Sequence, residues 1–241
     1  RKIFGNWFDK TYTKYRAKKG AIKSVGKTFD FFPHQKLIRD YLQIDSPYRG
    51  ILLYHGLGVG KTCASIAISE GFRSNRKIIV LLNKSLKQNF RGNLMFCGYE
   101  YFRTNQHWFY HEFTDSDPMR TYSKMVGVPN KFTRKHNGAW FIDFTKKPNF
   151  ETLSIRQQAL LEEQINYMID DRYTFLHMDG LTKKKLEKYV EDRIFDDALL
   201  IVDEVHNLSN AMAKVSQGVR AKNLERLIMN ASNLKLVFLI N

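Results

Sequence analysis

Cysteine and long apolar runs are scarce in this sequence of 241 residues. Its two cysteines, Cys63 and Cys97, are too few for a disulfide framework, so we expect a reducing compartment. The longest uninterrupted apolar runs have five residues, as in 78–82 and 198–202, whereas a transmembrane helix needs roughly 20. The first ten residues mix charges with aromatic rings, which is not a signal-peptide pattern. Disulfide-rich and membrane-spanning classes are therefore excluded, and we expect no membrane partner.

Negative charge is also in short supply. The chain has 24 Asp and Glu against 39 Lys and Arg, a net charge of +15, which favours a polyanionic partner. The imbalance is strongest in a basic aromatic N-terminal arm, residues 1–30, where nine Lys and Arg face two Asp. Cations beside stackable rings suit nucleic acid, and they equally suit a segment that lies on an acidic partner. Both interpretations stay open. The rings between these cations are Phe4, Trp7, Phe8, Tyr12 and Tyr15.

Short apolar strands alternate with helical segments along the rest of the chain. This order predicts an α/β fold, in which helices flank a central and mainly parallel sheet. Residues 96–150 differ, because 14 of these 55 residues are aromatic. They predict an aromatic-rich insertion that packs on the main sheet and contains a strand over 139–144. We therefore expect one lobe over 31–241, interrupted at about 96–150. The other strands are expected over 50–54, 78–82, 173–177, 199–202 and 234–240.

Two helices of this lobe are expected to begin at capping residues. Ser154 and Gln157 form a capping box before one helix. Thr182 caps the other, and its buried face is predicted to hold Leu186, Tyr189, Val190 and Ile194.

The segment between the first strand and the helix at Lys61 carries the strongest chemical signal. It reads His55-Gly56-Leu57-Gly58-Val59-Gly60-Lys61-Thr62. Glycines let the backbone wrap tightly, so that successive N–H groups and the helix N-terminus point at phosphate oxygens. Lys61 would reach the β- and γ-phosphates, and the Thr62 hydroxyl would bind Mg²⁺. The strict phosphate-loop pattern has Gly where His55 stands, but the position of the segment between a strand and a helix favours a phosphate loop. We therefore predict that residues 55–62 bind Mg·ATP.

An acidic pair follows the buried strand at 199–202. A phosphate loop needs an acidic partner for its metal at the end of a neighbouring strand, and a group that orients the attacking water. Asp203 suits the first task and Glu204 the second. We predict Asp203 as a metal ligand, and Glu204 and Lys61 as catalytic residues.

Gly-Val-Gly-Lys-Thr at 58–62 and Asp-Glu-Val-His at 203–206 resemble motifs I and II of superfamily 2 helicases and translocases of the DExH type. The resemblance implies a RecA-like phosphate-loop domain, which hydrolyses ATP with Mg²⁺. It also implies that Gln35 reads adenine and that His206 couples nucleotide state to nucleic-acid binding. Nucleic-acid contacts are implied for Lys84, Ser85 and Gly180.

Further segments are similar to the large-DNA-virus ATPases typified by the poxvirus early transcription factor small subunit and nucleoside triphosphatase I. These segments are 53–58, 63–68, 164–166, 173–175, 179–181 and 202–208. The resemblance implies a DNA-dependent ATPase, acting on duplex or single strands in viral transcription initiation or termination. Viral RNA polymerase or transcription-factor subunits are its implied partners. Its implied locations are the virion and the viral factory in the host cytoplasm.

The same resemblance implies a second RecA-like lobe that supplies an arginine finger. Because the chain opens at Arg1 and ends where motif III would begin, we expect a piece of a longer protein, without that lobe and nearly inactive alone. A non-enzymatic alternative is a nucleotide-binding or structural virion component that docks on an acidic partner.

Two weaker constellations have plainer explanations. His107 and His111 could share a helix face, with Cys97 upstream, but no third zinc ligand has suitable spacing. We therefore expect a packed or surface pair. The run Lys183-Lys184-Lys185 at a helix start could bind phosphate, although a solvated charge run is the simpler interpretation.

Overall fold

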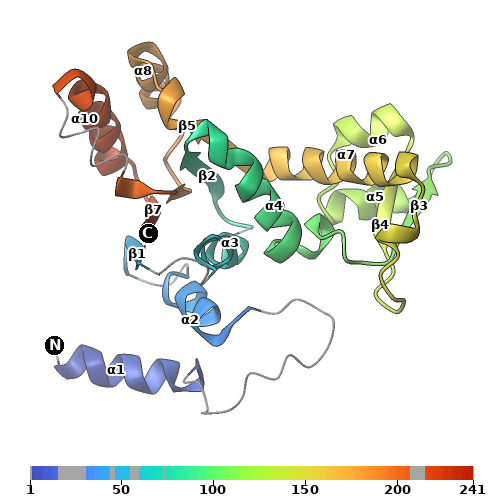
Figure 1. The fold of residues 1–241 in the computed structure, drawn as a ribbon, viewed down its shortest axis with the longest axis horizontal. Coiled ribbons are helices and arrows are strands. Elements are labelled where there is room, and N and C mark those ends of the chain that lie inside the picture. Colours follow the sequence, from blue (N-terminus) through green and yellow to red (C-terminus); the bar gives the residue numbers. More distant parts are fainter. Residues whose placement is uncertain are drawn as a thin grey trace. The chain divides into compact units, whose positions relative to one another are not determined.

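The computed structural model describes residues 2–15, 31–43, 47–54, 60–72, 74–206 and 215–240. It divides the chain into two compact units, the first formed by residues 1–84 and 176–241 and the second by residues 85–175 (Figure 1). The predicted insertion at 96–150 falls within the second unit. No described helix is long and apolar enough to cross a membrane.

The first unit is built on a five-stranded sheet with the order β1-β7-β6-β2-β5. The pairs β1–β7, β7–β6 and β6–β2 are all parallel. All five residues of β6 are buried, as expected of a central parallel strand that is covered on both faces. The predicted α/β architecture is therefore confirmed. The strands are β1 (Gly50–Tyr54), β2 (Lys77–Leu82), β5 (Tyr173–His177), β6 (Ala198–Val202) and β7 (Lys235–Ile240).

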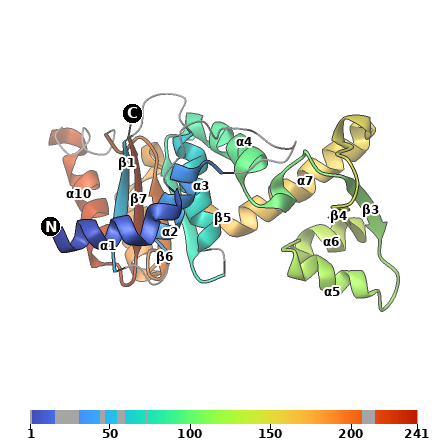
Figure 2. The ribbon, with the colours of Figure 1, turned by 90° about the horizontal axis from the view of Figure 1, so that it is seen from below.

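Helices flank this sheet on both sides. α8 and α10 lie on one side, and α2 and α3 lie on the other (Figures 1 and 2). Small and branched residues let α3 pack closely, so that seven of its eleven residues are buried. The helices are α1 (Lys2–Tyr12), α2 (Pro33–Tyr41), α3 (Lys61–Gly71), α8 (Lys183–Glu191) and α10 (Val215–Asn230), and short 3-10 turns lie at Thr13–Tyr15, Lys84–Leu86 and Met178–Gly180.

The predicted buried face of α8 is only partly correct. Thr182 caps the helix by accepting a hydrogen bond from the Lys185 N–H, and Leu186 is buried against α10 and the sheet. Val190, one turn further on, is 56% exposed. The prediction for Val190 is wrong because a hollow of about 330 Å³ opens between α8 and α10 at that point, and Val190 lines it together with Leu227.

The second unit joins an antiparallel hairpin to four helices. β3 (Trp108–Glu112) pairs with β4 (Gly138–Ile142), which confirms a strand near 139–144. The Ser154–Gln157 capping box is also confirmed. The helix face proposed for His107 and His111 is wrong, because His111 lies on β3 opposite Ala139. The helices are α4 (Lys87–Cys97), α5 (Pro118–Met125), α6 (Asn130–His136) and α7 (Ile155–Arg172), with 3-10 turns at Glu100–Phe102 and Phe150–Thr152.

One buried glutamine joins the hairpin of the second unit to its long helix. Gln164 of α7 is fully buried, and its amide accepts from the Trp140 N–H at 2.8 Å and donates to the Trp140 carbonyl at 2.9 Å. The side chain thus satisfies both backbone groups of a strand residue, as a neighbouring strand would. Four large aromatic residues of the same unit, Trp108, Trp140, Phe132 and Tyr101, are each at most 1% exposed.

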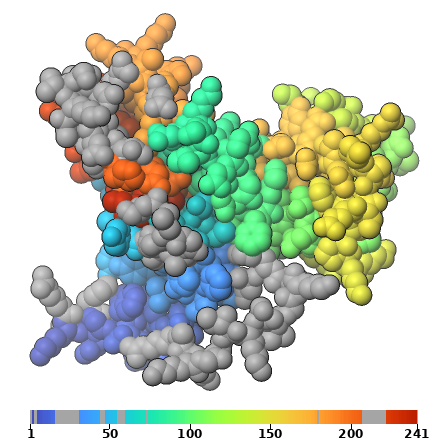
Figure 3. Space-filling model, viewed as in Figure 1, coloured from blue at the N-terminus to red at the C-terminus, as the bar shows by residue number. Residues whose placement is uncertain are grey.

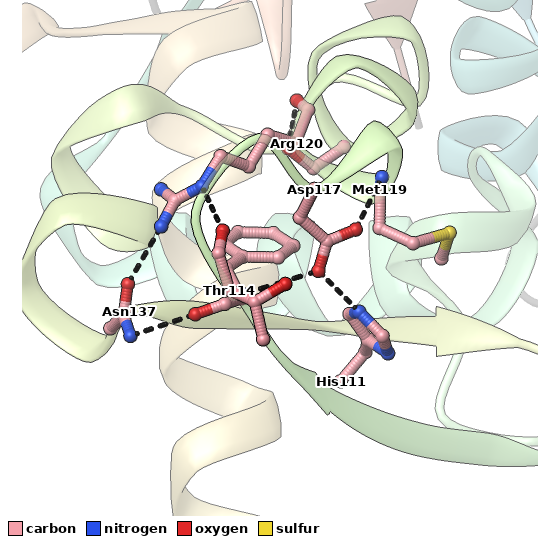
Figure 4. A network of polar contacts seen from close by, with 8 residues as sticks. His111, Thr114, Asp117, Met119, Arg120 and Asn137 are labelled. Carbon is pink, nitrogen blue, oxygen red and sulfur yellow. Dashed lines mark hydrogen bonds and ion pairs between the residues drawn. The ribbon is translucent and has the colours of Figure 1, made fainter.

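A polar network closes the turn between β3 and α5 (Figure 4). His111 Nε2 lies 2.7 Å from Asp117 Oδ2, which also accepts the Thr114 N–H at 3.3 Å. Arg120 donates to the Thr114 carbonyl and, at 2.9 Å, to the Asn137 side chain. The histidine that the sequence left without a role therefore supports a loop. No group of three or more His, Cys, Asp or Glu in the described ranges could hold a metal ion.

Asp117 should make the stability of the second unit depend on pH. The His111 hydrogen bond, and then the Met119 N–H, hold the pKa of Asp117 below its usual range. Because the folded pKa lies below the unfolded value of about 3.9, the stabilisation is present above that pH and is lost as the pH falls through the folded pKa.

We therefore expect the urea midpoint of the Asp117→Asn variant to change less than that of the wild type between about pH 5 and pH 2. Exposed Asp115, changed to Asn, is the matched control and should behave as the wild type. Equal pH profiles for wild type and Asp117→Asn would contradict this role.

Candidate nucleotide site

The first turn of α3 presents the end of the predicted phosphate loop. Gly60 is the N-cap residue, and its φ of 76° lies in the left-handed region. No side chain in the described ranges caps this turn. A helix N-terminus carries partial positive charge and N–H groups that suit an anion. Of the predicted loop, His55, Gly56, Leu57, Gly58 and Val59 lie outside the described residues, so their roles stay predictions.

Gln35 joins the first turn of α2 to this loop end. Its side chain is buried, accepts the Phe32 N–H at 2.9 Å and donates to the Gly60 carbonyl at 3.1 Å. The second contact thus joins Gln35, which is predicted to read adenine, to Gly60, which directly precedes Lys61. Gln35 therefore holds the loop end in place, and the adenine contact stays a prediction.

The conformation of Gly60 predicts a specific cost for a side chain there. An added Cβ would lie 2.8 Å from Gln35 Nε2, at a φ that L-residues adopt at a cost of about 1–2 kcal/mol. We expect Gly60→Ala to lower the free energy of unfolding by about 1–3 kcal/mol.

Gly92 offers the matched control, because an added Cβ in this exposed turn of α4 meets no heavy atom within 4 Å. Gly92→Ala should raise the free energy of unfolding by up to about 1 kcal/mol. Urea denaturation measures both changes. A neutral Gly60→Ala substitution would contradict a left-handed Gly60 that lies against Gln35.

Lys61 lies over the carboxyl ends of two neighbouring strands. Its Nζ donates to the Ile240 carbonyl, the last residue of β7, at 3.2 Å. Its charge also acts on the carboxyl of Asp203, directly after β6, where it offsets part of the rise in pKa that burial and Glu204 cause. The order β1-β7-β6 explains this convergence, because Lys61 follows β1 and reaches across the end of β7. The Ile240 carbonyl was missed because a backbone acceptor leaves no sequence signal.

Asp203 is fixed by the sheet and carries a poorly solvated charge. Its N–H donates to the Leu81 carbonyl of β2 at 2.9 Å, which extends the β6–β2 ladder by one bond. Burial, and then the charge of Glu204, raise the pKa of Asp203, and the Lys61 charge offsets only part of this. A carboxylate in this setting gains from a nearby cation.

Glu204 adopts a backbone conformation that is unusual for its residue type. Its φ is 54°, in the left-handed region, and its Oε2 lies 3.1 Å from His206 Nδ1. Such a conformation costs of order 1–3 kcal/mol, and residues that adopt it cluster at active sites and ligand-binding segments. The sequence motif gave no sign of this turn.

The side chains at this site fit Mg²⁺ and a nucleoside triphosphate. A Mg²⁺ ion prefers oxygen ligands and commonly takes one carboxylate together with phosphate oxygens. Asp203 and the Thr62 hydroxyl are such ligands, and Lys61 with the first turn of α3 suits phosphates. Among the other predicted contacts, Lys84 and Ser85 lie in the 3-10 turn after β2, and Gly180 lies in the 3-10 turn after β5. They are not joined to this cluster by any described contact.

The order of the strands, the first turn of α3 and the acidic residue that follows β6 together define a helicase-type ATPase lobe. Its fold is RecA-like. A family model described as "Type III restriction enzyme, res subunit" matches residues 21–236. The chain belongs to this family, and its place among superfamily 2 helicases of large DNA viruses is confirmed by its relatives.

The relatives come from several large DNA viruses. A protein of Acanthamoeba polyphaga mimivirus, named as a candidate ATP-dependent RNA helicase, is 28% identical over 225 residues, covering 88% of this chain and 17% of that protein. A second mimivirus protein, also named as a candidate ATP-dependent RNA helicase, is 33% identical over 108 residues, which cover 43% of this chain and 19% of that protein. A candidate helicase of Frog virus 3 is 34% identical over 95 residues, which cover 36% of this chain and 10% of that protein. The chain thus spans less than a fifth of each relative.

The sequence-based expectation of a reducing compartment stays a prediction.

Proposed function

We propose that the chain is the nucleotide-binding lobe of a DNA-dependent ATPase of viral transcription, with Mg·ATP at the carboxyl edge of β1, β7 and β6. The proposal is carried by one observation, the convergence of Lys61 and Asp203 across the end of β7. The family implies ATP use, and nucleic-acid binding follows from relatives named as helicases.

Each site residue has a distinct part in the proposed reaction. Lys61 and the first-turn N–H groups of α3 would bind the β- and γ-phosphates. Thr62 and Asp203 would hold Mg²⁺, which neutralises charge that develops on the phosphates. Glu204 would orient the attacking water and accept its proton. His206 is the proposed coupling residue, because its Nδ1 lies 3.1 Å from Oε2 of the carboxylate that would act in hydrolysis.

The distribution of charge supports nucleic acid as the partner of the first unit. The second unit, residues 85–175, has 12 Lys and Arg against 10 Asp and Glu, whereas the rest of the chain has 27 against 14. Nearly all of the excess positive charge thus belongs to the unit with the nucleotide site. We propose that it binds phosphates of duplex or single-stranded DNA, with Lys84 and Gly180 as contacts. The predicted contact Ser85 is the first residue of the second unit and stays a prediction.

A salt titration tests this proposal. If several phosphates are neutralised, the logarithm of DNA affinity should fall with the logarithm of salt concentration by about 0.9 per phosphate contact on duplex. Binding should depend little on base sequence, because backbone contacts carry no sequence information. A complex that is insensitive to salt would favour the structural alternative, in which the basic residues dock on an acidic protein.

The wider assignment rests on the family of viral ATPases that the motifs resemble. We propose action in transcription initiation or termination, with RNA polymerase or transcription-factor subunits as partners, in the virion and the cytoplasmic viral factory. We also propose that rapid turnover needs a second RecA-like lobe, because an arginine finger contributes about 10³- to 10⁵-fold in rate to related reactions. Mass spectrometry of purified virions tests the location, and an absent protein would contradict it.

A further inference from the structure

Described residues of the N-terminal arm pack on the chain's own α2. Tyr12 of α1 is 9% exposed, and its ring centroid lies 4.8 Å from that of Phe8 and 6.2 Å from that of Tyr41 on α2. Tyr41 in turn stacks on Tyr48 at 4.8 Å, with an angle of 13° between the rings. α1 runs beside α2 in the ribbon, and their atoms adjoin in the space-filling view (Figures 1 and 3). These rings are therefore engaged within the chain.

A second contact lies where the arm turns after α1. The Tyr15 hydroxyl donates to Asp40 Oδ2, and Lys14 Nζ lies 3.5 Å from the same oxygen. Arg39 Nε binds the other carboxylate oxygen at 3.0 Å. Asp40 thus joins the arm to the last turn of α2 through a charge-assisted hydrogen bond, which is among the stronger contacts of its kind.

The opposite end of α2 holds the nucleotide site. Gln35 lies in its first turn and donates to the Gly60 carbonyl, which also accepts the Ala64 N–H at 2.9 Å. Asp40 lies five positions after Gln35, which is about 7.5 Å along a helix. α2 is therefore a short rigid link between the arm and the first turn of α3. A shift of α2 would move Gln35 relative to Gly60.

We infer that residues 2–15 are a positioning element of the nucleotide site, which fixes α2 so that Gln35 holds Gly60 and the first turn of α3 in the conformation that binds phosphate. This inference rests on the proposed nucleotide site and adds a role for the arm that is separate from DNA binding. The aromatic rings pack on α2, while the exposed side chains of Lys10 and Lys14 keep positive charge on the surface of the arm.

The test compares Tyr12→Leu with the conservative variant Tyr12→Phe. The first removes the ring contacts with Phe8 and Tyr41, whereas the second keeps them. In the nucleotide-free protein, hydrogen exchange of the Ala64 amide should be faster in Tyr12→Leu and unchanged in Tyr12→Phe. This readout needs no nucleotide, so it remains valid if the proposed ATPase function fails. Unchanged exchange in Tyr12→Leu would overturn the inference.

Kinetics separate positioning from general destabilisation and from DNA binding. In the whole protein, Tyr12→Leu and Tyr15→Phe should raise KM for ATP at least threefold and leave kcat and the Kd for DNA unchanged. Tyr15→Phe keeps the ring and tests the same link should Tyr12→Leu fail to fold. Lys10→Ala, a charge change on the same helix, should leave KM unchanged. Weaker DNA binding with an unchanged KM in the tyrosine variants would show that the arm is a nucleic-acid element and overturn the inference.

Discussion

The Lys61→Ala variant is expected to lose nearly all affinity for ATP. Lys61 is the cation that the α3 start offers to the phosphates, and its Nζ already lies at the edge where they would bind. Hydrogen bonds to charged groups contribute about 1.5–3 kcal/mol each. The loss of contacts to two phosphates thus predicts an affinity lower by about 10²- to 10⁴-fold. Titration calorimetry with Mg·ATP measures this change.

Lys77 provides the matched control for that experiment. It begins β2, at the opposite edge of the sheet from the nucleotide site, and is exposed. Lys77→Ala removes the same charge and should leave ATP affinity unchanged. If Lys61→Ala also bound ATP normally, the phosphate-loop assignment would be wrong.

Glu204→Gln should separate ATP binding from hydrolysis. The amide fills the same space but cannot accept a proton, and general-base catalysis contributes about 10²- to 10⁴-fold in rate. We expect the whole protein to keep its ATP affinity while kcat falls by about this factor. Steady-state phosphate release with DNA present measures the rate, and Glu187→Gln on α8 is the control. Near-normal turnover in Glu204→Gln would place the catalytic base elsewhere.

Most strands of the main sheet could be predicted because they are short apolar runs between turns. β6 is such a run of five residues, which is long enough for a strand and too short for a buried helix. Capping residues were equally informative, since the Ser154 and Thr182 side chains bond to backbone groups only three residues away. Contacts between residues this close in the sequence can be predicted from residue type and spacing alone.

Contacts between distant segments were not predictable in the same way. β3 was missed because Trp108 to Glu112 lacks aliphatic residues, and only pairing with β4 makes it a strand. The arm's rings suited stacking on bases or packing on protein equally well, and the choice depends on Tyr41, about 30 residues further along. The left-handed turn at Glu204 also has no glycine to signal it.

Hydrogen exchange of the wild-type chain with and without Mg·ATP tests the central claim most directly, because it locates the nucleotide. Bound ATP should slow exchange at the first turn of α3, residues 60–64, and at residues 203–206. The amides of α7 in the second unit should exchange as before. Protection that falls on other segments and spares 60–64 would contradict a nucleotide site at the ends of β1, β7 and β6.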